Sequence, residues 1–156
     1  MARVRGSVRI AAPLEQVFDI VADSRNEPSF NPAMAEAELL TTEPVRLGSK
    51  FRARMERKRL AMVVELTEFD RPHRLASLTT SSMMETSGTV TFTPDAGATL
   101  MIWDWQVHPK GWFRALSPLV TPLGRRQERR IWGALKRKLE LQPVPTSTDG
   151  SRRNVH

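Results

Sequence analysis

The sequence changes sharply from a strand pattern to a helix pattern at Pro13, and this junction is the strongest constraint on the fold. Residues 3–10 alternate apolar and polar side chains, which is typical of a half-buried strand. Pro13 suits the first position of a helix, because its φ is already helical and its missing N–H would have no partner there. Apolar side chains then recur at helical spacing through residues 13–22. The sequence therefore predicts a strand followed at once by an amphipathic helix.

Several short strands follow, separated by turn residues. The connections between the alternating segments are short, which favours antiparallel pairing. The clearest turn is Pro94-Asp95-Ala96-Gly97, whose residue types suit a hairpin. A second short helical piece is expected between Asp23 and Phe30. We predict further strands at residues 34–42, 51–56, 62–69, 75–82, 88–93 and 99–107.

A long last helix is predicted near the end of the chain. Pro118 and Pro122 should break its beginning into short turns, so we expect regular helix from about Pro122 or Leu123 to Leu141. Its predicted apolar stripe recurs every four residues and consists of Leu123, Gln127, Ile131, Leu135 and Leu139. These elements together predict an α+β domain. The last helix should cross the inner face of a curved antiparallel sheet and leave a cavity beneath it.

Length and composition indicate one domain. We expect it to span residues 1–142 of the 156, while residues 143–156, rich in Pro, Ser and Thr, are expected to be disordered. The absence of cysteine excludes disulfides and thiolate chemistry. No apolar run is long enough for a membrane span and no leader pattern begins the chain, so we expect a cytoplasmic protein. No motif indicates a metal or a cofactor, and we expect neither.

The chain is strongly basic, with a formal net charge of +7. Its positive charge is concentrated in the last helix and in the strand pair around Arg52 and Arg54. Charge runs of this kind are usually solvated faces. The alternative is a weak contact with an anionic membrane, through the basic helix face with Trp112 and Phe113 as anchors. We expect no sequence-specific nucleic-acid binding, because the arginines flank an apolar stripe that must be buried.

Several segments occur in a characteristic order: Ile10-Ala11-Ala12-Pro13 with Val17-Phe18, Phe30-Asn31-Pro32, Gly48, and residues 68–75, 97–100 and 135–140. In this order the chain resembles the START-like, helix-grip superfamily, in its branch of polyketide cyclase/dehydrase and lipid-transport-like proteins. The resemblance covers residues 3–141, with Phe30 where the family usually has tryptophan. It implies a seven-stranded antiparallel sheet that wraps a long C-terminal helix around an apolar cavity, with two short helices after the first strand. It does not fix a reaction, because this fold hosts cyclases, carriers and other binders.

Alternation along residues 99–107 places Trp103 and Trp105 on one face of a strand and Asp104 on the other. We predict that the indoles face the last helix, because two large indoles on an open face would be costly. They then either line a cavity or fill an ordinary core. Asp104 should lie on the outer face. If this assignment is reversed, Asp104 becomes the leading catalytic candidate.

No catalytic residue can be assigned from the sequence. His108 ends a strand beside a proline, and no partner that would perturb it is apparent. Glu65 and Asp104 could act as general acid or base only if they faced the cavity and were desolvated. Gln127 interrupts the apolar stripe and is the best candidate for a polar group that orients a ligand; otherwise it lies at the edge of the stripe.

We predict that the protein binds a hydrophobic small molecule, polyketide-like, aromatic or lipidic, and that it is a monomer or homodimer. The alternatives are a cyclase/dehydratase-type enzyme that acts on a ligand folded in the cavity, and a peripheral lipid-binding protein. A buried ionisable group with a shifted pKa would favour the enzyme, whereas a lining of apolar groups and amides would favour binding alone. The predicted lining residues are Phe30, Phe51, Met55, Met83, Trp103, Trp105, Leu119, Leu123, Gln127 and Ile131.

Overall fold

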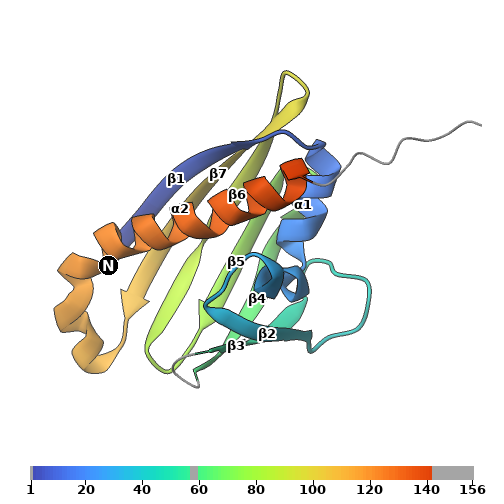
Figure 1. The fold of residues 1–156 in the computed structure, drawn as a ribbon. Helices are drawn as coiled ribbons and strands as arrows, with labels where there is room; N and C mark the ends of the chain where they lie inside the picture. Colours follow the sequence, from blue (N-terminus) through green and yellow to red (C-terminus); the bar gives the residue numbers. More distant parts are fainter. Residues whose placement is uncertain (1, 57–59, 142–156) are drawn as a thin grey trace, which may run out of the picture.

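The computed structural model describes residues 2–56 and 60–141 of the chain. A strand and two short helices come first, a series of strands follows, and a long helix ends the described chain (Figure 1). The predicted disordered tail, residues 143–156, lies outside the described residues. The elements in chain order are β1 (Ala2–Ile10), α1 (Leu14–Ala22), the 3-10 helix η1 (Ser24–Ser29), β2 (Met34–Leu39), β3 (Lys50–Met55), β4 (Ala61–Asp70), β5 (Arg74–Thr80), β6 (Met84–Asp95), β7 (Ala98–Pro109), the 3-10 helix η2 (Gly111–Leu116) and α2 (Ser117–Leu141).

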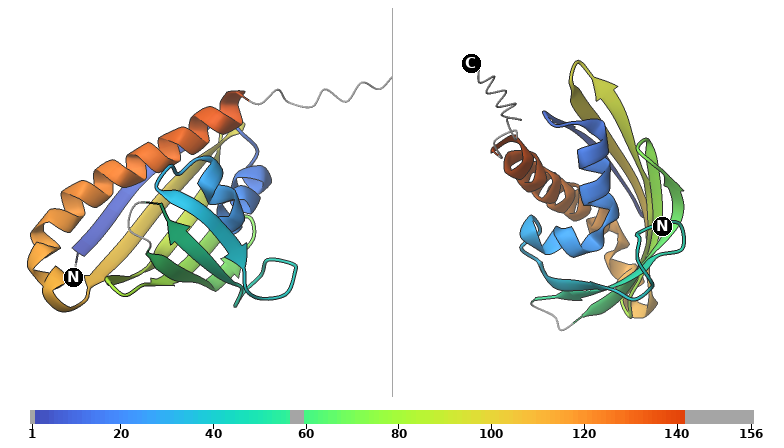
Figure 2. Two further views of the ribbon diagram at one scale, coloured as in Figure 1. Left: turned by 60° about the horizontal axis from the view of Figure 1, so that its bottom comes forward. Right: turned by 90° about the vertical axis from the view of Figure 1, so that its right-hand side faces the viewer.

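The strands form one seven-stranded antiparallel sheet in the order β1-β7-β6-β5-β4-β3-β2. The sheet curves around α2, which lies along its concave face (Figure 2). The helices α1 and η1 lie on the same side of the sheet, next to the C-terminal end of α2, where Lys138 Nζ donates a hydrogen bond to Ser29 Oγ. The predicted helix-grip architecture is confirmed.

The core lies between the concave face of the sheet and the helices α1 and α2. Phe18 of α1 packs edge-on against Phe69 and Phe92, with ring centroids 5.2 and 5.3 Å apart. Leu135 of α2 is fully buried. Each such buried side chain contributes about 1.5–3 kcal/mol. Ordinary apolar packing therefore holds α1 and the second half of α2 on the sheet.

The strand β6 begins at Met84, earlier than the predicted start at Gly88. Gly88 lies opposite Trp105 of β7, and a Cβ at this glycine would overlap the backbone oxygen of Asp104 and would lie 2.8 Å from Trp105 Cε3. The glycine therefore lets the backbone of β7 and the Trp105 ring approach closely, and the strand continues through it.

The helix α2 also begins earlier than predicted, at Ser117. Pro118 falls in the first turn, where its N–H would have had no partner. Pro122 lies inside the helix, but the carbonyl that it leaves unpaired belongs to the exposed Pro118, which water can reach. The two prolines therefore do not interrupt the helix.

The buried side of α2 differs from the predicted stripe in the first half of the helix. The second half of the stripe is buried as predicted, but its first two members, Leu123 and Gln127, are exposed. Gly124 faces β1 instead, and a Cβ on it would lie only 2.8 Å from Val4 Cγ2. The missing side chain lets the helix approach β1 closely at this position, so the predicted stripe is wrong here.

Candidate functional site

Two tryptophans of β7 point toward α2, as the alternation predicted. Trp103 is buried and Trp105 is half-buried. Each indole lies against a glycine on a neighbouring strand, Gly6 for Trp103 and Gly88 for Trp105. A Cβ on Gly6 would overlap the Trp103 ring. Gly6 thus makes room for the Trp103 ring, and Gly88 for the Trp105 ring together with the backbone of β7.

Asp104 lies on the outer face of the sheet, which confirms its predicted placement. Its carboxylate accepts hydrogen bonds from Nε and Nη2 of Arg3, at 2.9 and 2.7 Å. These bonds hold the pKa of Asp104 below its ordinary value. A carboxylate that is ionised, paired and turned away from α2 is unsuited to proton transfer beneath the helix.

Glu128 of α2 is the polar group that meets Trp105 of β7 and Trp132 of α2. Its Oε2 accepts hydrogen bonds from Trp105 Nε1 at 3.3 Å and from Trp132 Nε1 at 2.5 Å. Trp132 lies one turn further along α2 and is buried. One oxygen of Glu128 therefore joins the helix to the sheet, and both bonds leave Oε1 for another partner.

Burial gives Glu128 an unusual pKa. Removal from water disfavours the charged carboxylate and raises the pKa from 4.5 to about 7. The hydrogen bonds from the two indoles lower the pKa, and the negative charge of Glu27 raises it. Near neutral pH, Glu128 is therefore present in both protonation states.

Glu27 of η1 is a second carboxyl group in this region. Its Oε1 accepts a hydrogen bond from Asn31 Nδ2 at 2.9 Å. Burial raises the pKa of Glu27, although the bond from Asn31 lowers it. Two interacting carboxyl groups in a poorly solvated place resist ionising together, so they release their protons in separate steps. Such a pair can both give and take a proton.

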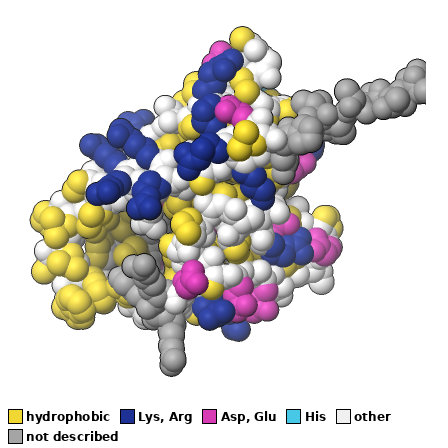
Figure 3. Space-filling model, in the orientation of Figure 1, with side chains coloured by type: hydrophobic (Ala, Val, Ile, Leu, Met, Phe, Trp, Pro, Cys, Tyr) yellow, Lys and Arg dark blue, Asp and Glu magenta, His cyan; other side chains and the backbone are white. Residues whose placement is uncertain are grey.

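The concave face beyond Trp105 carries hydroxyl groups that α2 does not fully cover. By register, a row from Trp105 crosses Gly88 and Ser77, and the next row includes Thr86 and Thr79. Alternation turns these hydroxyl side chains toward the concave side, where they are half-buried. The surface is hollowed beside α2, and hydrophobic side chains are visible in the hollow (Figure 3).

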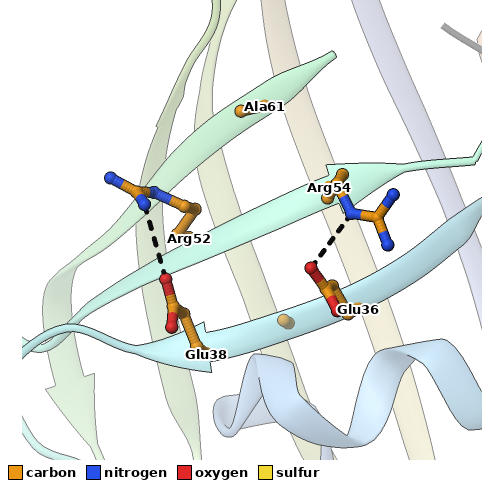
Figure 4. Close-up of a pocket in the computed structure, with 6 residues that line it drawn as sticks. Glu36, Glu38, Arg52, Arg54 and Ala61 are labelled. Carbon is orange, nitrogen blue, oxygen red and sulfur yellow. Dashed lines mark hydrogen bonds and ion pairs between the residues drawn. The ribbon is translucent and has the colours of Figure 1, made fainter. Parts of the chain in front are cut away.

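A separate depression lies on the outer face of the sheet, over β2, β3 and the start of β4 (Figure 4). Its volume is about 330 Å³. Two exposed ion pairs line it, Arg54–Glu36 at 3.0 Å and Arg52–Glu38 at 3.6 Å. These side chains alternate with the buried Phe51 along β3, so the depression is on the opposite face from Glu128. It is not the cavity that the sequence predicted.

Within residues 2–56 and 60–141, no group of three or more His, Cys, Asp or Glu side chains is placed to hold a metal ion. Among the helices of the described chain, none is both long and apolar enough to cross a lipid bilayer.

The family model of polyketide cyclase/dehydrase and lipid transport proteins matches residues 1–140. The chain belongs to this family. A START superfamily protein from Mycobacterium smegmatis is similar in structure, with a TM-score of 0.77, 19% identity, and coverage of 90% of this chain and 98% of that one. The Zhui aromatase/cyclase from a Streptomyces species has a TM-score of 0.74 and 16% identity, with coverage of 88% and 93%. At these identities the neighbours show a shared fold. No curated protein matches the sequence significantly.

The lining residues predicted for this family member fall into three environments. Four of them are buried in the core: Phe30, Phe51, Trp103 and Ile131. Three are half-buried: Met55, Met83 and Trp105. Three are exposed: Leu119, Leu123 and Gln127. Contact of any of them with a ligand stays a prediction.

Sequence reasoning missed Glu27, Glu128 and Trp132. The predicted stripe ran through Gln127 and did not include the neighbouring Glu128. A usable signal was present, because Glu128 and Trp132 are four residues apart and share one helix face. A carboxylate one turn from a tryptophan indicates a hydrogen bond to the indole N–H.

Proposed function

We propose that the protein binds a hydrophobic small molecule that carries an oxygen function, in the hollow between the concave face of the sheet and α2. The observation that carries this proposal is the placement of Glu128. Two indole N–H groups orient its carboxyl on the concave side, toward which the half-buried hydroxyl side chains of β5 and β6 also turn. A mostly apolar site with a few placed polar groups is typical of small-molecule binding.

Glu128 suits the role of a polar anchor in either protonation state. The protonated carboxyl donates a hydrogen bond to a carbonyl oxygen, and the ionised carboxylate accepts one from a hydroxyl group. Because Trp105 and Trp132 already hold the side chain, a ligand does not bear the entropic cost of ordering it. Apolar contact supplies affinity at about 25 cal/mol per Å² buried, while Glu128 sets the orientation of the ligand.

The second candidate function is a cyclase/dehydratase-type reaction, and the pKa of Glu128 near 7 favours it. A general acid or base works best when its pKa lies close to the working pH. In a dehydration, protonated Glu128 gives its proton to a hydroxyl group, which leaves as water with the C–O electron pair. The carboxylate of Glu27 takes a proton from the adjacent carbon, and that C–H electron pair forms the double bond. The name aromatase/cyclase of one structural neighbour gives a reaction class to test.

Binding is tested by titrating the protein with Nile red, a neutral apolar dye, on both sides of pH 7. We expect a Kd that is roughly micromolar, about −8 kcal/mol. The affinity should rise as the pH falls through about 7, because protonated Glu128 is uncharged and costs less to cover with an apolar dye. Glu128→Gln should bind the dye with little dependence on pH.

The matched control is Glu38→Gln, which removes an exposed carboxylate from the outer face and should keep the pH profile of the wild type. Absence of dye binding, or an unchanged pH profile in Glu128→Gln, contradicts the proposal. Mass spectrometry of the molecule that co-purifies separates the two candidates. An enzyme converts this molecule and loses that activity in Glu128→Gln, whereas a binding protein returns it unchanged.

A further inference from the structure

An exposed apolar surface covers η2 and the first turns of α2. Its large side chains are Trp112, 72% exposed, Leu116, 42% exposed, Leu119, 54% exposed, and Leu123, 62% exposed. Trp112 stacks on Phe113 with ring centroids 3.9 Å apart. Figure 3 shows hydrophobic side chains gathered at this end of the molecule, next to a cluster of Lys and Arg over α2. We call the four residues Trp112, Leu116, Leu119 and Leu123 the apolar end.

The apolar end continues directly into a basic stripe on the same side of α2. Leu119 and Leu123 are followed seven residues later by Arg126 and Arg130, and a step of seven residues returns almost to the same face of a helix. Both arginines are exposed. Neither takes part in an ion pair within the described residues.

The sequence around this surface carries positive charge without compensation. Between Lys110 and Gln127 there is no Asp or Glu, while Arg114, Arg125 and Arg126 lie within that segment. The next carboxyl group, Glu128, is turned inward to the indoles. The surface therefore pairs large exposed apolar side chains with a net positive charge.

We propose that this surface docks onto an anionic phospholipid membrane. The apolar end enters the boundary between headgroups and acyl chains, and Arg126 and Arg130 contact lipid phosphates. Tryptophan favours this boundary because its ring is apolar and its N–H is polar. Arginine beside an anionic surface gains electrostatic attraction, which salt screens. This proposal does not depend on the ligand site at Glu128.

The charge distribution favours lipid over other occupants. A second copy of the chain would bring two arginine stripes together, and each chain already has a formal net charge of +7. The C-terminal segment of this chain, residues 142–156, is a poor partner for the same reason, since it carries Arg152 and Arg153 and only two valines as large apolar residues. Nucleic acid would satisfy the arginines but leave Leu119 and Leu123 without an apolar partner.

Docking is tested by co-sedimentation with vesicles of neutral phosphatidylcholine and with vesicles in which half of the lipid is phosphatidylglycerol. We expect binding to the anionic vesicles, loss of binding in high salt, and little binding to neutral vesicles. Emission of the exposed Trp112 should shift to the blue on binding. In Trp112→Phe this shift should disappear.

Two double variants separate the apolar and the basic contributions. Leu119→Gln with Leu123→Gln should weaken binding to anionic vesicles at least tenfold, and Arg126→Gln with Arg130→Gln should do the same. All four side chains are exposed, so circular dichroism and thermal unfolding should match the wild type.

The controls remove similar side chains from the connection between β2 and β3 and from the first residue of β3, near the opposite end of the molecule (Figure 1). Leu47, 61% exposed, is changed to Gln, and Arg46→Gln with Lys50→Gln removes two exposed charges. Both controls should bind vesicles like the wild type. The proposal is wrong if anionic vesicles do not bind, or if the controls weaken binding as much as the test variants. It is also wrong if the protein forms a dimer that Leu119→Gln with Leu123→Gln dissociates, because a second copy then covers the surface.

Discussion

The two halves of α2 lie along one sheet, yet they differ in what they present to it. The second half buries a continuous side from Ile131 to Leu139. The first half places Gly124 on Val4 of β1 and leaves Leu119 and Leu123 exposed. The second half of the helix therefore serves the core, and the first half leaves Leu119 and Leu123 available for other contacts. A single regular helix can thus change its role within two turns.

Glu128 lies at the boundary between these two halves. It is covered enough for burial to raise its pKa to about 7, and it lies next to the half-buried Trp105 on the open part of the concave face. A fully packed position would have no access to a ligand, and a fully exposed carboxylate would keep its ordinary pKa. The boundary is thus the part of α2 best suited to chemistry.

The largest difference between the halves should appear when a leucine is truncated in each. Leu135→Ala removes a fully buried side chain and should lower the free energy of unfolding by about 2–5 kcal/mol. Leu123→Ala removes an exposed side chain and should change it by less than about 0.5 kcal/mol. Urea denaturation of both variants measures the contrast. Equal losses would mean that Leu123 also packs in the core.

The next effect concerns pH at the boundary between the halves. The pKa of Glu128 rises from 4.5 to about 7 on folding, so its protonated form stabilises the fold below pH 4.5, and this contribution is lost as the pH rises through about 7. In Glu128→Gln, the free energy of unfolding should no longer fall as the pH rises through about 7. At about 1.4 kcal/mol per unit of pKa, the variant should gain up to ~3 kcal/mol relative to the wild type above pH 7.

Denaturation at several pH values checks this slope. Glu140→Gln is the control at the far end of α2. Lys136 holds the pKa of Glu140 below its ordinary value, so its contribution is lost only as the pH falls, the opposite direction. A pH slope that is the same in Glu128→Gln and in the wild type would show that Glu128 is well solvated.

Replacing a glycine of α2 by alanine should raise stability at one position and lower it at another. Gly133→Ala meets no atom closer than Arg137 Nη1 at 3.8 Å, so it should stabilise the helix by about 0.5–1 kcal/mol. Gly124→Ala brings a methyl group to 2.8 Å from Val4 Cγ2 and should destabilise the fold by about 1 kcal/mol despite its better helix propensity. Val4→Ala should relieve the second effect in a double variant. Stabilisation by both substitutions would refute the close contact with β1.

The smallest effect is expected at Pro122, inside the first half of α2. Pro122→Ala restores an N–H that can pair with the carbonyl of Pro118, but that carbonyl is already accessible to water. The substitution also increases the conformational entropy of the unfolded chain, which lowers stability by about 0.4–1 kcal/mol. The net change in stability should stay within about 0.5 kcal/mol in thermal unfolding. A gain of several kcal/mol would show that Pro122 strains the helix.

The strands of this protein could be predicted from residue order with little ambiguity. Side chains alternate by half a turn along a strand, so an error of one position would reverse the whole pattern and expose Trp103. Alternation placed Trp103 and Trp105 on one face of β7 and Asp104 on the other, and the cost of exposing two indoles selected the concave face for the tryptophans. The ordered segments that resemble the helix-grip family added the number of strands and the position of the last helix.

Which side of α2 is buried depends on the surface of the sheet against which the helix packs. Each residue turns about 100° around a helix, so residues spaced by four drift by about 40° at each step. A stripe drawn from Leu123 to Leu139 drifts by about 160° and cannot lie on one face. Local pattern and turn chemistry therefore determined the strands, the turns and the existence of the helix. Only packing against a partner defines which side of a helix is buried. The contact of Gly124 with Val4 and the hydrogen bond from Trp105 turn Glu128 toward the sheet and leave Gln127 exposed.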